Sequence, residues 1–322
     1  MNTASRSDSV RGGGGATGGR TAIVSAAVCT DADTGSYFEL AARAGRQALE
    51  AAEISPDRVG LVVNAGVFRD SNIAEPAVAA LIQKRLEVGL EYETGRVPAF
   101  SFDLLNGGTG VIHALMTAQC FTGLGDVEYA LIVAGDTHPS TERGRADFPY
   151  TASGGAILLH SSQSAGGFGR IYTSEAAGAI APTAWANLEA AGTDGRNALT
   201  VNANVGDPLA LAQEALRELL VGEGLQSSDF ATGRAVLLAP APIPGFRERV
   251  AYQLGIPSAA VAGIDPFVGD PYSASPVHAY LSAATQGMLD EARSVVFLAA
   301  DENSAAALVY RPRALVAAEP AS

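Results

Sequence analysis

Short apolar segments alternate with longer amphipathic segments along most of the chain. Short runs rich in Val, Ile, Leu and Ala are typical of buried strands, and apolar positions spaced three or four residues apart are typical of helices. The strands that this pattern predicts cover residues 21–30, 58–66, 98–104, 127–135, 154–161, 168–175, 234–239, 294–300 and 304–310. The predicted helices cover residues 37–53, 75–91, 109–122, 207–222, 245–254 and 274–291. This alternation predicts an α/β protein.

The order of the elements repeats once along the chain. Strands 127–135 and 154–161 follow each other with no helix between them, and strands 294–300 and 304–310 do the same. We therefore expect two similar α/β halves flanked by tails. The boundaries expected from this repeat are 1–20 for the first tail, 21–165 and 166–312 for the two halves, and 313–322 for the second tail.

The first tail is rich in Ser, Gly and Arg, which is typical of disordered segments. Within it, Gly14–Thr21 nearly matches a phosphate-binding loop, with Arg20 in place of the lysine. Such a loop needs a strand before it and a helix after it, whereas here a strand follows. We interpret this segment as part of the tail.

Charge and cysteine content narrow the class of protein. The chain has 322 residues and a formal net charge of -13, which argues against nucleic acid as a partner. Cys29 and Cys120 are too few for a disulfide framework or a metal cluster, and they suit a reducing cytoplasm. No apolar run approaches the roughly 18 residues that a membrane helix needs, and no signal segment is visible. We expect a cytoplasmic protein that does not enter a membrane.

The sharpest motif is Phe102–Gly110 (FDLLNGGTG), which spans a predicted strand-to-helix turn. It resembles the F-D-x-x-N-A-C-x-G segment of the type III β-ketoacyl-ACP synthases, the FabH-like and OleA-like condensing enzymes. In that family a cysteine thiolate at the helix N-terminus takes an acyl group from a thioester, and nearby backbone N–H groups stabilise the oxyanion. The resemblance places Gly108 at the cysteine position, and glycine cannot form an acyl-enzyme.

In two further family motifs the flanking residues match this chain but the catalytic residue does not. The helix that follows the family's histidine ends in L-G-I-P, which Leu254–Pro257 matches, and the family spacing then places the histidine near Pro240. The family's G-N-x-x-S/A-A-S resembles Gly269–Ser275, with Asp270 at the asparagine position. A carboxylate there repels a developing oxyanion. The resemblance therefore implies a member of this family that lacks the catalytic Cys-His-Asn set.

The resemblance covers residues 21 to 312 approximately, and it implies the five-layered αβαβα thiolase fold. Two glycine-rich motifs of the family are also changed in this chain. Thr151–Ala156 stands where the family has G-D-G-A-G-A, and Asp301-Glu302-Asn303 stands where it has a late G-x-G turn. The family needs no cofactor, so the resemblance implies only an acyl-CoA or acyl-carrier-protein thioester as substrate.

No other residue is an obvious replacement for the cysteine. Cys120 lies 12 positions after Gly108, roughly 18 Å along a helix, and we expect it to be an ordinary buried thiol. Cys29 lies in the first predicted strand and is expected in the core. Thr109 is adjacent to Gly108 but points elsewhere in the family and carries no general base.

The candidate residues of a residual pocket are polar groups close to these motifs: Asn106, Thr109, His113, Asp136 and Asp270. His113 either faces the channel that holds the acyl chain in the FabH-like enzymes, or it is packed against neighbouring residues, and we favour the second interpretation. Asp136 and His138 follow a strand, where α/β proteins place ligand contacts, but a local Asx turn is the simpler interpretation. No pair of histidines has metal-ligand spacing, so no metal site is expected.

Three functions remain open. The first is a non-catalytic subunit that forms a dimer with an active ketosynthase-III-like partner in bacterial fatty-acid or polyketide-type secondary metabolism. The second is an active homodimer that transfers acyl groups directly, with His113, Asp136 and Asp270 as acid–base groups. The third is an acyl-thioester-binding or regulatory protein. An acyl carrier protein is a further candidate partner, which Arg143, Arg145, Arg247 and Arg249 could contact, although such charges are usually only solvated.

Overall fold

The computed structural model describes most of the chain. The described residues are 21–73, 75–90, 98–125, 127–164, 166–177, 184–186, 199–201 and 206–312. The expected tails, 1–20 and 313–322, lie outside the described residues, and so does most of the segment that resembles a phosphate-binding loop.

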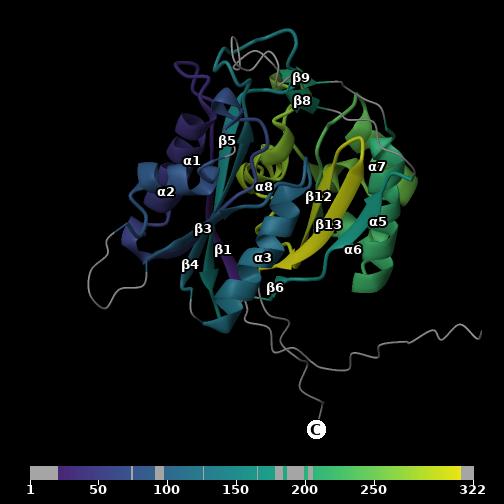
Figure 1. Cartoon of the computed structure of the whole chain (residues 1–322). Helices are drawn as coiled ribbons and strands as arrows, with labels where there is room; N and C mark the ends of the chain where they lie inside the picture. The colour runs from purple at the N-terminus through teal and green to yellow at the C-terminus, as the bar shows by residue number, and fades with distance from the viewer. Residues whose placement is uncertain are drawn as a thin grey trace, which may run out of the picture.

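Five strands of the first half form one sheet in the order β1-β5-β4-β2-β3 (Figure 1). Their bounds are β1 (Thr21–Cys29), β2 (Val59–Asn64), β3 (Phe100–Asp103), β4 (Tyr129–Asp136) and β5 (Ser153–Ser161). Strand β2 runs parallel to β3 and β4, while β5 is antiparallel to both β1 and β4. Strand β3 therefore lies at an edge of this sheet.

The second sheet repeats this arrangement in the order β11-β10-β12-β13-β6, with β7 also paired to β13. Its strands are β6 (Gly167–Phe168), β7 (Tyr172–Glu175), β10 (Ala235–Leu238), β11 (Val261–Ala262), β12 (Ser294–Ala300) and β13 (Ser304–Arg311). Strand β10 is parallel to β11 and β12, and β13 is antiparallel to β12, β6 and β7. Strand β13 thus corresponds to β5. Strands β8 (Ala184–Ala186) and β9 (Leu199–Val201) form a separate pair.

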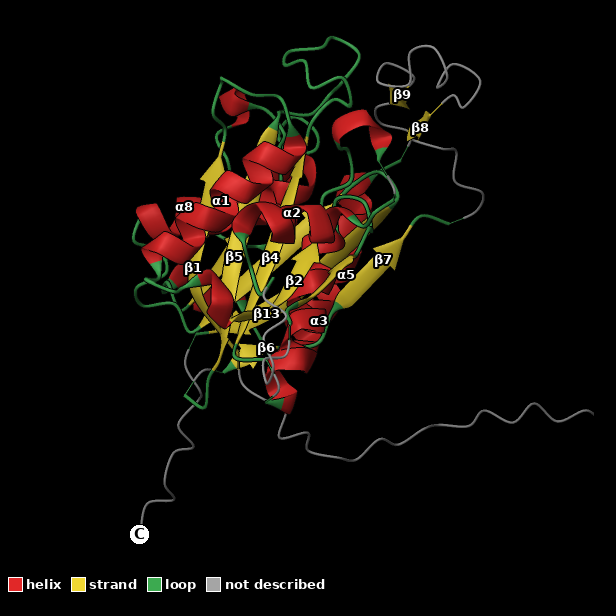
Figure 2. Cartoon of the chain, turned by 60° about the vertical axis from the view of Figure 1, so that its left-hand side comes forward, coloured by secondary structure: helices red, strands yellow, loops and turns green. Residues whose placement is uncertain are grey.

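Three buried apolar clusters define five layers. The described helices are α1 (Tyr37–Ala51), α2 (Val78–Leu86), α3 (Gly110–Leu124), α5 (Pro208–Glu223), α6 (Ser227–Ala231), α7 (Phe246–Leu254) and α8 (Ser275–Thr285). Helices α3 and α8 share one core with the inner faces of both sheets. Helices α1 and α2 cover the outer face of the first sheet, and α5, α6 and α7 cover that of the second (Figures 1 and 2). The order is αβαβα, as the sequence predicted.

The complete burial of some strands explains why the sequence pattern predicted them correctly. Every residue of β4 and β12 is buried, because helices cover both faces of each sheet, and such strands are continuous apolar runs. Ser36 caps α1, because its hydroxyl accepts from the amide of Glu39, and Asp207 caps α5, because its carboxylate accepts from the amides of Leu209 and Ala210. The starts expected for these two helices, at 37 and 207, agree with the structure to within one residue.

Several sequence predictions were wrong in detail, and the helix expected over 75–91 is the shorter α2, Val78–Leu86. The strand expected over 168–175 is two short strands, Gly167–Phe168 and Tyr172–Glu175. The helix expected over 274–291 ends at Thr285, followed by turns that include Gly287 at a φ of 70°. Cys120 is exposed on α3 and is not a buried thiol, whereas Cys29 is buried as expected. Within the described part of the chain, no helix combines the length and the apolar character needed to cross a membrane.

Candidate functional site

The turn between β3 and α3 is held by the last residue of the strand. One carboxylate oxygen of Asp103 accepts from the amide of Ala79 at 2.7 Å and from the side chain of Asn64 at 3.0 Å. The other oxygen accepts from the amide of Val78 at 2.9 Å. Asp103 therefore caps α2 and positions the end of β3 beside β2.

Three of the candidate residues come together at this turn. The side-chain amide of Asn106 donates to the hydroxyl of Thr109 at 3.0 Å, and this hydroxyl donates to the carbonyl of Asn106 at 2.8 Å. Nδ1 of His113 lies 3.2 Å from the Asn106 amide nitrogen and 3.1 Å from the Thr109 carbonyl oxygen. The three side chains thus bind one another, and His113 is packed onto the turn.

The two glycines of the turn face the second half of the chain. The amide of Gly108 donates to Oδ2 of Asp301 at 2.9 Å. A side chain at Gly108 would point toward the ring of Tyr272, at 3.4 Å, and Cβ of Asp301, at 3.5 Å. Gly107 has a φ of 54°, and a Cβ there would overlap Oδ2 of Asp301. The carboxylate can approach only because residue 107 is glycine.

These two glycines form a matched pair for mutation. Gly107→Ala adds a Cβ at positive φ and against Asp301, so we expect a loss of about 1–3 kcal/mol in the free energy of unfolding. Gly108→Ala meets only ordinary contacts, and we expect a change of less than about 1 kcal/mol. Urea unfolding of both variants measures this difference. Equal losses would contradict the described packing of Asp301 against Gly107.

Asp301 is buried between β12 and β13, and both of its oxygens are bonded. Oδ1 accepts from the amides of Asn303 at 2.9 Å and Ser304 at 2.8 Å, and from the Ser304 hydroxyl at 3.3 Å. Oδ2 accepts from Gly108 and lies 3.5 Å from the hydroxyl of Tyr272. In the sequence, Asp301 stands out only because Asp301-Glu302-Asn303 replaces a G-x-G turn of the FabH-like enzymes. That departure was the signal that could have identified it.

A cavity of about 190 Å³ lies beside this contact. Its lining residues are Pro149, Tyr150, Pro208, Pro242, Asp270, Tyr272, Ala300, Asp301 and Glu302. None of these described lining residues is cationic. A second cavity of about 320 Å³ shares Pro242 and Asp270 with it and extends along Ala241–Glu248. The candidate Asp270 therefore lines both cavities.

Aromatic rings form one wall of the smaller cavity. The rings of Tyr150 and Tyr272 stack with centroids 4.1 Å apart, and the ring of Phe68 packs against both. Burial raises the pKa of both tyrosines, and the negative charges of Glu302 and Asp301 raise it further. Burial also raises the pKa of Asp270, whose carboxylate accepts from the amide of Tyr272. Both phenols therefore stay protonated at neutral pH.

Asp136 is buried at the end of β4 and does not form the expected local Asx turn. One oxygen accepts from the amides of Val67 at 3.1 Å and Phe68 at 2.7 Å. The other accepts from the amide of Ser273 at 3.0 Å and from its hydroxyl at 2.6 Å. Burial raises the pKa of this carboxyl to about 6, although the hydrogen bonds oppose the rise. Asp136 links the two halves and does not line either described cavity.

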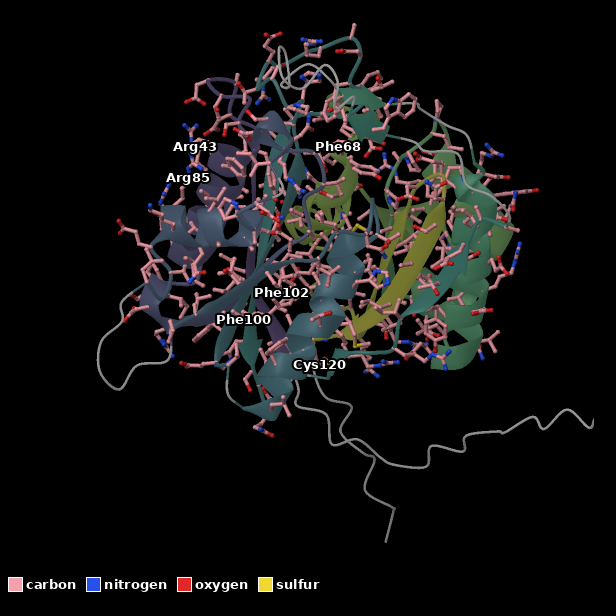
Figure 3. The ribbon with its side chains drawn as sticks, viewed as in Figure 1. Arg43, Phe68, Arg85, Phe100, Phe102 and Cys120 are labelled. Carbon is pink, nitrogen blue, oxygen red and sulfur yellow. The ribbon has the colours of Figure 1, made fainter. Side chains whose placement is uncertain are left out.

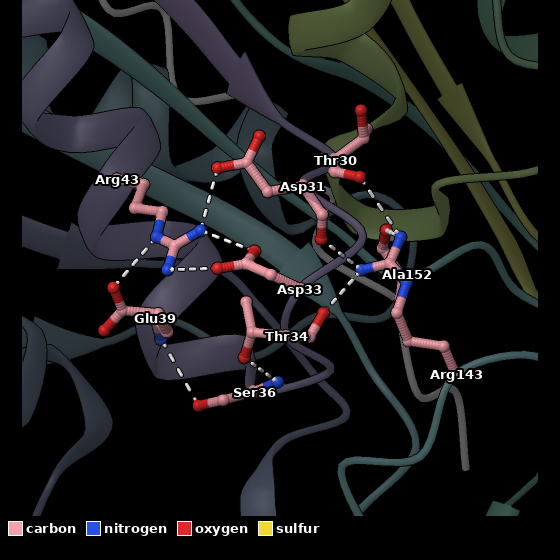
Figure 4. A network of polar contacts seen from close by, with 9 residues as sticks. All are labelled: Thr30, Asp31, Asp33, Thr34, Ser36, Glu39, Arg43, Arg143 and Ala152. Carbon is pink, nitrogen blue, oxygen red and sulfur yellow. Dashed lines mark hydrogen bonds and ion pairs between the residues drawn. The ribbon is translucent and has the colours of Figure 1, made fainter.

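The loop that carries Tyr150 into the site is anchored by Arg143 (Figure 4). Its guanidinium donates to the carbonyls of Asp31 at 2.9 Å, Thr34 at 2.7 Å and Thr30 at 3.2 Å. The interpretation of this arginine as a solvated charge was therefore wrong, because it holds the loop against the end of β1.

The remaining predicted positions are less central. Pro240 is buried just after β10, and the cavity wall on that side is Pro242. His138 is buried, its Nδ1 accepts from the amide of Ser140 at 3.1 Å, and burial lowers its pKa. Among the described residues, no group of three or more His, Cys, Asp or Glu side chains could hold a metal ion.

The relatives of the chain are condensing enzymes. No family model matches. The chain is 32% identical over 126 residues to the β-ketoacyl-ACP synthase III of Actinobacillus succinogenes, which covers 38% of this chain and 37% of the relative. It is 31% identical over 99 residues to the acyl-CoA:acyl-CoA alkyltransferase of Xanthomonas campestris, covering 31% and 27%. The match thus spans about 37% of the length of the first relative.

Solved structures resemble the whole described architecture. FabH from Pseudomonas aeruginosa aligns with a TM-score of 0.74 at 20% identity, covering 92% of this chain and 99% of that one. An OleA variant from Xanthomonas campestris with bound lauric acid and lauroyl-CoA gives 0.69 at 17% identity, covering 91% and 99%. The priming β-ketosynthase of a polyketide pathway gives 0.68 at 17% identity, covering 92% and 97%. The relatives and structural neighbours are thus thiolase-superfamily ketosynthases of the FabH and OleA type, and this chain has their fold.

Proposed function

We propose that this protein is a non-catalytic subunit that pairs with an active ketosynthase-III-like enzyme. The observation that carries the proposal is the surroundings of Gly108. The space that a side chain there would enter is bordered by the ring of Tyr272, Cβ of Asp301 and the carbonyl of Ala300. None of these groups can take an acyl group from a thioester and be activated by a neighbouring base.

The alternative, a homodimeric enzyme without a covalent intermediate, depends on three acid–base groups. Asp136 is buried and uses both oxygens in hydrogen bonds to Val67, Phe68 and Ser273. His113 is bound to the turn that precedes its own helix. Only Asp270 lines the cavity. Two of the three groups that this alternative requires therefore lie away from the cavity, and a general acid or base must lie within hydrogen-bond reach of the proton that it transfers.

The proposed substrates of the pair are acyl thioesters carried by CoA or by an acyl carrier protein. The relatives are named as a β-ketoacyl-ACP synthase III and an acyl-CoA:acyl-CoA alkyltransferase, and both names specify acyl carriers of this kind. The chemistry would take place in the partner, which would supply the Cys-His-Asn set. This chain would contribute the shape of the shared substrate tunnel.

Strand β3 has a partner on one side only among the described strands, and this edge supports pairing. Phe100 is 55% exposed on this edge strand and lies next to Phe102 (Figure 3). Its ring also packs against that of Phe121. Leu105 and Leu124, at either end of the adjoining turn and helix, are 47% and 77% exposed. Exposed apolar side chains along an unpaired strand edge favour association with another chain. We propose that the active subunit covers this edge.

Native mass spectrometry of the tagged protein, isolated from its own cells, tests the proposed function. We expect a stable complex with a second chain of similar size that carries a Cys-His-Asn set. A homodimer with no such companion would overturn the proposal. That result would make the cysteine-free homodimeric enzyme the function to test.

The proposed partner surface can be tested separately. Phe100→Glu places a charge on the exposed edge of β3, and we expect the amount of complex to fall at least about tenfold. The matched control is Val221→Glu, because Val221 is 85% exposed on α5 in the opposite outer layer. Retention of the complex in the Phe100 variant would exclude this edge as the contact.

A further inference from the structure

We infer that Asp301 is a built-in anionic ligand of the turn before α3, and that it closes this chain's own site to acyl thioesters. The inference rests on the proposed assignment of the Gly108 turn as the counterpart of a thioester site. It goes further by naming the residue that determines which ligands the turn excludes.

The position of the carboxylate is that of a bound anion. Oδ2 of Asp301 accepts from the amide of Gly108, two residues before α3 begins at Gly110. The N-terminus of a helix carries partial positive charge and unpaired N–H groups, so it attracts anions and carbonyl oxygens. In this protein the donor at residue 108 already has an acceptor from the same chain.

The carboxylate is held firmly in that position. Its other oxygen accepts from the amides of Asn303 and Ser304, so rotation away from Gly108 would break these bonds as well. The side chain is 4% exposed, and water therefore cannot readily replace the lost partners. Gly107, at positive φ, leaves the space that Oδ2 occupies. An incoming carbonyl would have to displace a buried carboxylate with several donors.

The cavity beside this contact also disfavours anions. Asp270 and Glu302 line it together with Asp301, and no cationic side chain is found among its described lining residues. The pKa of Tyr272 is raised by burial and then by the charge of Asp301, which indicates a negative potential at the ring. A thioester oxygen, which gains negative charge when attacked, would be repelled here.

Binding of acetyl-CoA to the purified full-length chain tests the inference. Asp301→Asn keeps an oxygen that accepts from the amides of Asn303 and Ser304. It replaces the oxygen that accepted from Gly108 with an NH₂ group, so the amide of Gly108 becomes free to donate to a ligand. Asp301→Gly restores the family residue. We expect both variants to bind acetyl-CoA at least about tenfold more tightly than the unmodified protein in isothermal titration calorimetry.

The matched control is Asp265→Asn. Asp265 is exposed and accepts from one nearby amide, that of Phe267, so its loss also removes a negative charge and a local hydrogen bond. We expect no gain in affinity from this control. A gain equal to that of Asp301→Asn would overturn the inference, because net charge alone would then explain binding.

A second readout needs no variant. In the unmodified protein we expect the ¹⁵N–¹H resonance of Gly108 to stay in place when acetyl-CoA is added. Tight binding by the unmodified chain with a shift of this resonance would overturn the inference, and so would folded Asp301 variants that gain no affinity. These outcomes are independent of the proposed function, since the presence or absence of a partner in cell extracts does not affect them.

Discussion

Replacing Asp136 with alanine is expected to lower the free energy of unfolding by about 3–5 kcal/mol. The change leaves the buried amides of Phe68 and Ser273 and the partly buried amide of Val67 without their acceptor, and it leaves a void at the end of β4. Urea unfolding measures the loss. Asp265→Ala is the control, because that exposed carboxylate accepts from a single nearby amide and should cost less than about 0.5 kcal/mol.

The pH dependence provides an independent check on the same carboxyl. Burial raises its pKa from 3.8 to about 6, so the native state favours the protonated form. The stabilisation from protonation is complete below pH 4 and is lost as the pH rises through 6. This loss is at most about 3 kcal/mol, at roughly 1.4 kcal/mol per pKa unit. The alanine variant should lack this component. An unchanged pH profile in the variant would contradict the assignment of the shift to Asp136.

Gly108→Cys is expected to form no detectable acyl-enzyme with acetyl-CoA, although it places a cysteine at the position where the FabH-like enzymes that this segment resembles have one. The new thiol would lie beside the Asp301 carboxylate and the Tyr272 ring, and a neighbouring negative charge disfavours the thiolate. Replacement of the cysteine in the proposed partner should instead reduce activity at least about a thousandfold. Intact-protein mass spectrometry detects the adduct, and product formation by the complex measures activity.

Gly108→Ala is the control for this experiment, because it fills the same space without a thiol. An acetyl adduct on the cysteine variant, absent from the alanine variant, would show that the site can still activate a nucleophile. That result would contradict the non-catalytic assignment of this chain. Activity that survives loss of the partner's cysteine would contradict it as well.

The layers of the fold could be predicted because their signals are local. Buried strands such as β4 and β12 are continuous apolar runs, and the start of α3 follows directly from a motif. The exposure of Cys120 could not be predicted in this way. Helix α3 is apolar around most of its circumference, so periodicity does not show which side faces solvent.

The chemistry of the site depends on contacts that local patterns do not report. Gly108 and Asp301 are 193 positions apart, and Asp136 bonds to Ser273 across 137 positions. Gly108 and Asp270 could be located from the flanking residues of two motifs. Asp301 could be noticed only because it stands where the FabH-like enzymes have the first glycine of a G-x-G turn. Whether Asp136 faced a ligand or the protein depended on segments that come together only in the folded chain.

The hydrogen bond from Gly108 to Asp301 and the stacking of Tyr150 on Tyr272 both join one half of the chain to the other. Gly108 and Tyr150 come from the first half, whereas Asp301, Tyr272 and Asp270 come from the second. Neither half alone would contain the cavity or the buried carboxylate contact. Both therefore report on docking of the halves during folding, so the chemical shift of a single amide, that of Gly108, could time the moment when the two sheets meet.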